Sequence, residues 1–95
     1  GYYWRGHAYL ANKDYEKAAS DFSKAIKIKK SDDRFFAGRA QAYLGQNKVK
    51  YALIDMALAL RVNRQPYYHS ILSRVFEKMG HKSRAIVSVG EPDRA

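Results

Sequence analysis

The sequence lacks cysteine, has only two prolines, and carries half as many acidic residues as basic ones. Without cysteine there is no disulfide, no thiolate metal site and no cysteine nucleophile. No apolar run approaches the roughly 20 residues of a membrane-spanning helix, and no signal-peptide pattern opens the chain. The 95 residues have room for one small domain, or for a few repeat units that share a continuous core.

The net charge is +9, from 18 Lys and Arg against 9 Asp and Glu. The excess is spread over residues 1–32, 33–65 and 66–95, so it does not form a basic arm. Hydrophobic residues make up 46% of the chain, which is typical of a folded protein. The charge makes an anionic partner a candidate.

A set of small and aromatic residues recurs at a fixed interval along the chain. Its members in the first copy are Gly6, Tyr9, Ala18, Phe22 and Ala25, and 34 residues later they become Ala40, Tyr43, Ala52, Met56 and Ala59. A third copy follows 33 residues further on, at Ser73, Phe76, Ala85 and Val89. The missing residue falls near Arg64-Gln65-Pro66, where a loop tolerates it. A repeat of this length predicts stacked structural units.

The motifs that recur are Arg5-Gly6-His7-Ala8-Tyr9 with Asp14-Tyr15-Glu16-Lys17-Ala18, and Arg39-Ala40-Gln41-Ala42-Tyr43 with Tyr51-Ala52-Leu53. This pattern resembles the tetratricopeptide repeat. The resemblance implies an all-α fold, a right-handed solenoid of antiparallel helix pairs with about three repeats. We assign the repeats to residues 1–32, 33–65 and, truncated, 66–89, with a tail at 90–95.

Periodicity and end signals predict six helices, at residues 2–11, 14–29, 33–44, 48–62, from Pro66 to before Gly80, and from about Lys82 to 89. Ser31-Asp32-Asp33 offers caps for the third helix, which is expected to stop at Gly45. No following helix covers Ile86 and Val89, and the first helix lacks its opening residues. The chain is therefore expected to be a segment of a longer array, or to form a homodimer through its uncapped ends.

Nothing in the sequence points to catalysis. His7, His69 and His81 have no His, Asp or Glu partner three or four residues later, as a helical metal site requires. Glycine-rich phosphate loops, nucleophile elbows and paired carboxylates on one helix face are also missing. We expect a protein that is not an enzyme and needs no cofactor or metal.

The first helix of each repeat carries a second stripe, which is predicted to face a concave groove. The predicted peptide-binding groove consists of Tyr3, Trp4, His7, Arg34, Ala37, Gln41, Tyr67, Ser70 and Arg74. Aromatic and Arg side chains are enriched at binding hot spots. The predicted function is therefore that of an adaptor or scaffold that holds a peptide or helix of another protein.

The recurring Arg-Gly and Arg-Ala motifs look like those of the repeats that grip the C-terminal carboxylate of heat-shock chaperones. That activity does not carry over, because the clamp's Lys, Asn and Arg positions hold Tyr3, His7, Gly38, Tyr67 and Ile71. Arg34 and Arg74 remain as cations that could pair with an acidic or phosphorylated peptide.

Nucleic-acid binding through the basic surface is an alternative, and a homo-oligomerisation module is another. Lys24, Lys27, Lys29 and Lys30 cluster near the end of the second helix, where cations complement the helix dipole and stay solvated. The cations do not line one face with interleaved aromatics, which favours a protein partner over nucleic acid. The sequence assigns no compartment.

Overall fold

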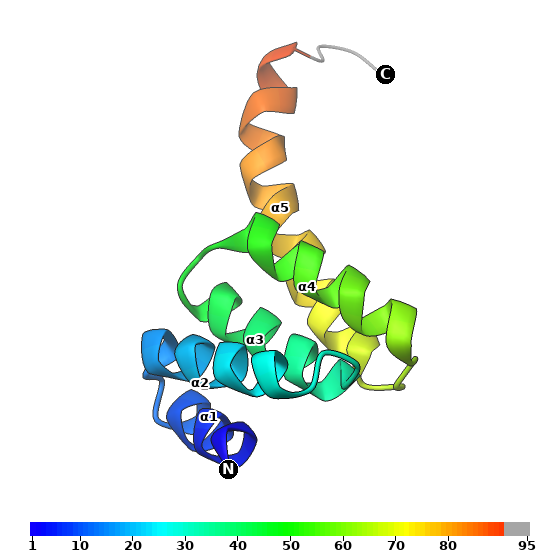
Figure 1. Cartoon of the computed structure of the whole chain (residues 1–95). Coiled ribbons are helices and arrows are strands. Elements are labelled where there is room, and N and C mark those ends of the chain that lie inside the picture. The colour runs from blue at the N-terminus through cyan, green and yellow to red at the C-terminus, as the bar shows by residue number, and fades with distance from the viewer. Residues whose placement is uncertain (91–95) are drawn as a thin grey trace.

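The computed structural model describes the backbone of residues 1–90 and the side chains of residues 1–80. The chain forms five helices in order: α1 (Tyr2–Ala11), α2 (Tyr15–Ile28), α3 (Asp33–Gly45), α4 (Val49–Val62) and α5 (Tyr68–Gly90). Short turns make α1 with α2, and α3 with α4, into packed pairs (Figure 1). Within residues 1–90 there is no strand, so the expected all-helical solenoid class is confirmed.

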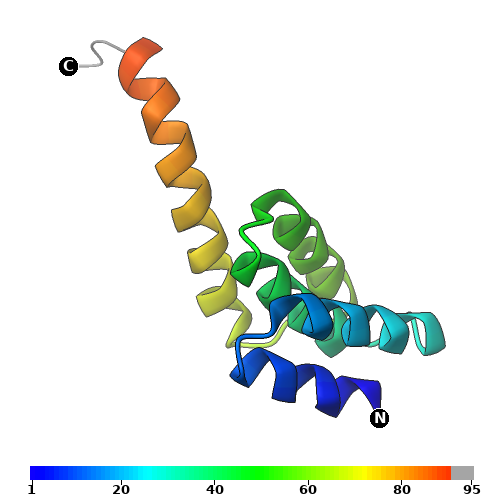
Figure 2. The same ribbon diagram turned by 90° about the vertical axis from the view of Figure 1, so that its left-hand side faces the viewer.

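Each helix packs mainly on its neighbours in the chain. α2 contacts α3, and α5 contacts both α4 and α3, while the first helices of the two pairs, α1 and α3, also touch. Contacts of this kind build a stack in which each unit depends on the next one. Figure 2 shows α1, α3 and the start of α5 following one another along one side of the stack.

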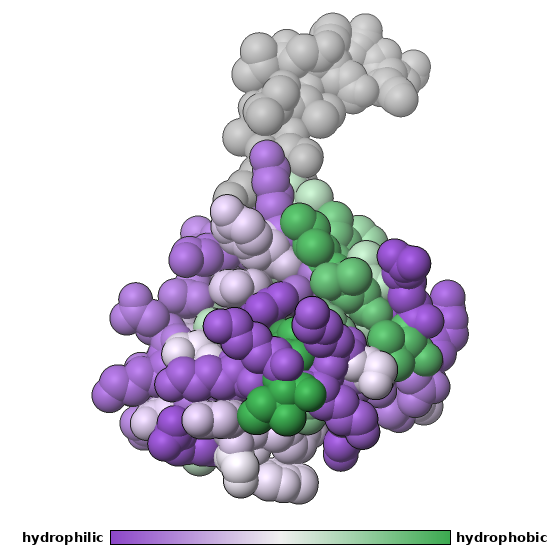
Figure 3. Space-filling model, in the orientation of Figure 1, coloured by the Kyte–Doolittle hydropathy of each residue, from purple (hydrophilic) through white to green (hydrophobic). Residues whose placement is uncertain are grey.

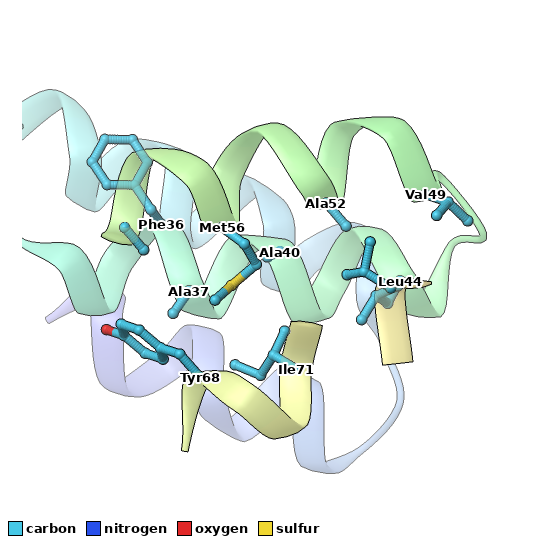
Figure 4. Close-up of a cluster of buried hydrophobic side chains, with 11 residues drawn as sticks. Phe36, Ala37, Ala40, Leu44, Val49, Ala52, Met56, Tyr68 and Ile71 are labelled. Carbon is cyan, nitrogen blue, oxygen red and sulfur yellow. The ribbon is translucent and has the colours of Figure 1, made fainter. Parts of the chain in front are cut away.

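Two apolar cores lie between the layers. The smaller one joins the two helix pairs around Phe22, with Ala18, Ala19 and Ala42. The larger one lies between α3, α4 and α5; its buried members are Phe36, Ala37, Ala40, Leu44, Val49, Ala52, Met56, Ala59, Tyr68, Ile71 and Val75 (Figure 4). The recurring alanines are nearly all inaccessible, which confirms the prediction that helices approach closely at these positions.

The turns inside the two helix pairs have the same conformation. Lys13 and Asn47, 34 residues apart, adopt φ angles of 61° and 64° in the left-handed region. In the first turn the Lys13 N–H donates to the Leu10 carbonyl (2.9 Å) and the Asp14 N–H to the Tyr9 carbonyl (2.8 Å). This pair of bonds is the Schellman arrangement, which closes a helix C-terminus.

We expect Lys13→Asn to stabilise the protein by about 0.5 kcal/mol, because asparagine tolerates left-handed backbone better than lysine. The reciprocal change, Asn47→Lys, should lower stability by a similar amount. Urea denaturation followed by circular dichroism checks both. Shifts of the same sign for the two variants, or a loss for Lys13→Asn with a gain for Asn47→Lys, would contradict this account of the left-handed turns.

The third helix ends at Gly45, as expected, but the left-handed residue of the turn is Asn47 and not Gly45. No glycine has positive φ among those described. The lack of a side chain at Gly45 has another reason: a Cβ there would lie 2.3 Å from the ring of Tyr15. Gly45 therefore makes room for an aromatic ring.

The predicted break near Gly80 is wrong, since α5 runs without interruption from Tyr68 to Gly90. Gly80 occupies the place of Lys13 and Asn47 in the repeat, yet its backbone stays helical. One glycine costs a helix only about 1 kcal/mol relative to alanine, and no proline stands within the helix to end it. The second half of α5 extends away from the packed helices (Figures 1 and 2).

This continuous helix leaves one face of α5 without the partner helix that α1 and α3 have. Phe76, which corresponds to Tyr43, is 57% exposed. The other face packs on the preceding pair through Tyr68, Ile71 and Val75. The side chains of Ala85, Ile86 and Val89, and the tail at 91–95, lie outside the described residues. Among the described residues, no helix combines the length and apolar character needed to cross a bilayer.

Candidate functional site

An aromatic cluster on the first helix forms the centre of the predicted groove. The ring of Tyr3 contacts Trp4 at 4.9 Å and His7 at 4.7 Å between centroids, both edge to face. It also meets Phe35 of α3 at 5.4 Å. Burial raises the pKa of the Tyr3 hydroxyl, and the nearby Tyr67 raises it further. The structure thus joins aromatic rings of α1 and α3 in one surface.

A pocket of about 490 Å³ opens beside this cluster. α1 contributes Tyr2, Tyr3 and Trp4, α2 contributes Ala25, Ile28 and Lys29, and α3 contributes Arg34 and Phe35; Gly1 completes the lining. Trp4 is 69% exposed, so its indole is largely free for a ligand to cover. Large apolar walls with a few cations suit an apolar side chain that has an anionic neighbour.

Arg34 is engaged within its own turn and is not the free cation that the sequence suggested. Its Nε and Nη2 donate to the two carboxylate oxygens of Asp32 at 3.0 and 2.8 Å. Asp32 also caps α3 by accepting from the Arg34 backbone N–H at 3.0 Å. These bonds hold the pKa of Asp32 below its usual range. The guanidinium lies 5.0 Å from the centre of the Tyr3 ring, so Arg34 is a positioned part of the pocket wall.

His7 lies partly buried next to the cluster. Its ring contacts Tyr3 and, at 5.2 Å, the buried Phe22. Burial lowers the pKa of His7, which favours the neutral form at pH 7. The side chain therefore contributes shape and polarity to this surface, and no positive charge.

The remaining residues of the predicted groove differ in how exposed they are. Gln41 is partly buried on α3, while Ser70 and Arg74 are exposed on α5. Tyr67 is 48% exposed in the turn before α5, and its ring rests on Tyr68 at a centroid distance of 4.8 Å. Gln41 and Arg74 stand at the repeat equivalents of His7, and Ser70 stands at the repeat equivalent of Tyr3.

Ala37 does not belong to this surface, and its place in the predicted groove is wrong. Only 1% of the residue is exposed, and it packs in the larger core. The reason is that α5 covers this part of α3, with Tyr68 and Ile71 in the same core cluster. The groove is therefore interrupted in the middle of α3.

Two ion pairs, each with a buried carboxylate, were missed by sequence reasoning. Arg5 binds Asp21 through two hydrogen bonds of 2.7 and 2.9 Å, and Arg39 binds Asp55 through two of 2.8 and 2.9 Å. Both partners recur at the 34-residue interval, which is the signal that could have revealed them. Each pair links the first helix of a repeat to its second. The Arg5 hydrogen bonds lower the pKa of Asp21.

A third buried carboxylate connects the start of α3 to the start of α5. Asp33 accepts a hydrogen bond from the hydroxyl of Tyr68 and one from Gln65 Nε2. Burial, followed by this bond, raises the pKa of Tyr68. These bonds fix the entry of α5, and with it the position of Tyr67.

Most of the carboxylates among the described side chains are buried, so few of them lie on the surface. Asp21, Asp32, Asp33 and Asp55 are all buried. The side chains described up to residue 80 include only three other acidic residues, Asp14, Glu16 and Glu77. Within the same range, no group of His, Asp or Glu side chains could hold a metal ion. The accessible charge is therefore mainly positive.

Comparison with known proteins gives a family for the first part of the chain. Residues 1–32 match the family model described as "Tetratricopeptide repeat". Comparison with curated proteins and with solved structures finds no significant match. The matched segment covers α1, α2 and the turn that leads to α3. The match over residues 1–32, together with five helices packed in a stack, fits a tetratricopeptide-type repeat protein.

Proposed function

We propose that the protein is an adaptor that holds a segment of another protein on the side formed by α1, α3 and α5. The observation that carries this proposal is the aromatic pocket, with the exposed Trp4 at its rim. Tetratricopeptide repeats generally mediate protein–protein interaction. Trp, Tyr and Arg are the residue types most enriched at interaction hot spots, and Tyr3, Trp4 and Arg34 meet here.

The pocket favours an apolar or aromatic anchor side chain that is followed by acidic residues. Tyr2, Phe35 and Ile28 form apolar walls, while Lys29 and Arg34 stand at the same opening. Arg74, exposed on α5, extends the positive charge along the surface. An extended acidic segment could thus keep its anchor in the pocket and its charges over α5.

The test is a selection of random peptides against the wild-type protein, followed by calorimetric titration of the selected peptides. Trp4→Ala should weaken binding at least tenfold because the anchor loses its largest contact, and Arg74→Glu should weaken the acidic peptides. Ala57→Ser, an exposed change on α4 outside the pocket, is the control and should leave affinity unchanged. Peptides that bind both groove variants as tightly as the wild type would contradict this site.

Nucleic-acid binding is the second candidate, favoured by the depletion of exposed carboxylates. Phosphate binding would be steeply salt-dependent. A titration of single-stranded RNA and duplex DNA from low to physiological salt decides this point, since a protein that binds neither at low ionic strength has no such function.

A further inference from the structure

The outer face of α4 carries an exposed apolar stripe, far from the aromatic pocket in the sequence. Tyr51, Ile54 and Val62 are 59%, 56% and 44% exposed, and Leu58 lies partly buried between them. Their spacing of three and four residues places the four side chains on one side of the helix. We call these four residues the α4 stripe. Figure 3 shows hydrophobic residues gathered in a band over α4.

The same helix position in the first repeat is polar. The residues 34 positions earlier, on α2, are Lys17, Ser20, Lys24 and Ile28, so three of the four are hydrophilic. α2 packs between α1 and α3 as α4 packs between α3 and α5. The fold therefore does not need apolar residues here, and the stripe is a property of α4 alone. An apolar patch that folding does not require indicates a contact with another molecule.

Part of the stripe is held in place before any partner arrives. The ring of Tyr51 leans on Tyr43, with a centroid distance of 5.6 Å. Tyr43 in turn lies 5.7 Å from the guanidinium of Arg39, which is fixed by Asp55. A ring restrained in this way loses little conformational freedom on binding.

The charges around the stripe have one sign. Lys50 and Arg61 are exposed on α4, beside the stripe. The one acidic residue of α4, Asp55, is 2% exposed and bound to Arg39. In an antiparallel contact between two copies of this helix, Lys50 of one would approach Arg61 of the other. Like charges at close range disfavour such a dimer and favour an acidic partner.

We propose that the α4 stripe is a second docking site, which binds an amphipathic helix of a partner protein with an apolar face and acidic edges. The apolar face covers Tyr51, Ile54, Leu58 and Val62, and the acidic edge reaches Lys50 and Arg61. The stripe and the aromatic pocket share no residue. One protein can therefore hold two segments at once.

The test uses two synthetic helical peptides, one with leucines at three- and four-residue spacing flanked by glutamates, the other with lysines in place of the glutamates. Fluorescence anisotropy at physiological salt should show binding of the acidic peptide alone. The double change Tyr51→Lys/Ile54→Ser, which copies the residues of α2, should weaken it at least tenfold with an unchanged circular dichroism spectrum. Arg61→Glu should weaken it too, while Trp4→Ala should not.

Four results would overturn the proposal. The first is that neither peptide binds the wild type, and the second is that the double variant binds as tightly. The third is a homodimer in sedimentation velocity that the double variant abolishes, because the stripe would then hold a second copy. Loss of binding with Trp4→Ala would place the acidic helix at the aromatic pocket, and so it also contradicts a separate docking site on the α4 stripe.

Discussion

Phe22→Ala is expected to lower the free energy of unfolding by about 3 to 5 kcal/mol. The side chain is fully buried at the centre of the smaller core, between the two helix pairs. Gly6 and Gly38 both face its ring, and a Cβ at Gly38 would lie 2.5 Å from it. The helix backbones at Gly6 and Gly38 are held apart by this ring, and they cannot move together enough to fill the space that its removal leaves. For a domain whose stability is roughly 5 to 15 kcal/mol, this loss is large.

Urea denaturation followed by circular dichroism measures this effect, and the fluorescence of Trp4 reports on α1 separately. The matched control is Phe76→Ala, the same change at a ring that is 57% exposed, which should shift stability by less than about 1 kcal/mol. Similar losses for the two variants would show that Phe22 does not join the repeats as described.

Asp55→Ser, the second change with a large expected effect, should lower the free energy of unfolding by about 3 kcal/mol. Asp55 is 2% exposed and receives both hydrogen bonds of the Arg39 guanidinium. Its removal leaves a partly buried cation whose remaining side-chain hydrogen-bond partner, among the described residues, is Ser23. Breaking a buried pair by removing one partner typically costs about 3 to 5 kcal/mol, and the partial exposure of Arg39 places this case at the lower end.

The third copy of the repeat supplies the control for this pair. It has Leu72 where the second copy has Arg39, and Ser88 where it has Asp55. The double change Arg39→Leu/Asp55→Ser should therefore cost less than Asp55→Ser alone, because no unpaired charge remains. Thermal and urea unfolding of Arg39→Leu, Asp55→Ser and the double variant complete the cycle. Additive losses would show that the two side chains do not depend on each other.

The repeat interval was enough to predict the first four helices closely. The positions expected to be small because backbones approach, such as Ala18 and Ala52, are fully buried. The continuation of α5 through Gly80 was not predictable in this way. A glycine permits a left-handed turn but does not force one, and in this chain the helix continues.

The candidate site was predicted less completely. Tyr3, Trp4 and Arg34 do meet at one pocket, but its other walls come from Ile28 and Lys29 at the end of α2, which no stripe on the first helices contains. The bond between Arg34 and Asp32 depends on rotamers, so spacing alone could not decide it. Ala37 was misplaced because the coverage of α3 by α5 depends on tertiary packing.

The burial of four carboxylates also affects how quickly partners are found. Asp21, Asp32 and Asp55 are enclosed and bonded to Arg5, Arg34 and Arg39, and Asp33 is enclosed beside Tyr68. Few exposed carboxylates therefore stand among the other lysines and arginines that face solvent. The resulting positive field attracts an anionic molecule before any contact forms, and such attraction accelerates diffusional encounter by 10-fold or more at low salt. Encounter with an acidic partner is thus governed by the whole charged surface, whereas the lifetime of the complex depends on the few residues that it covers.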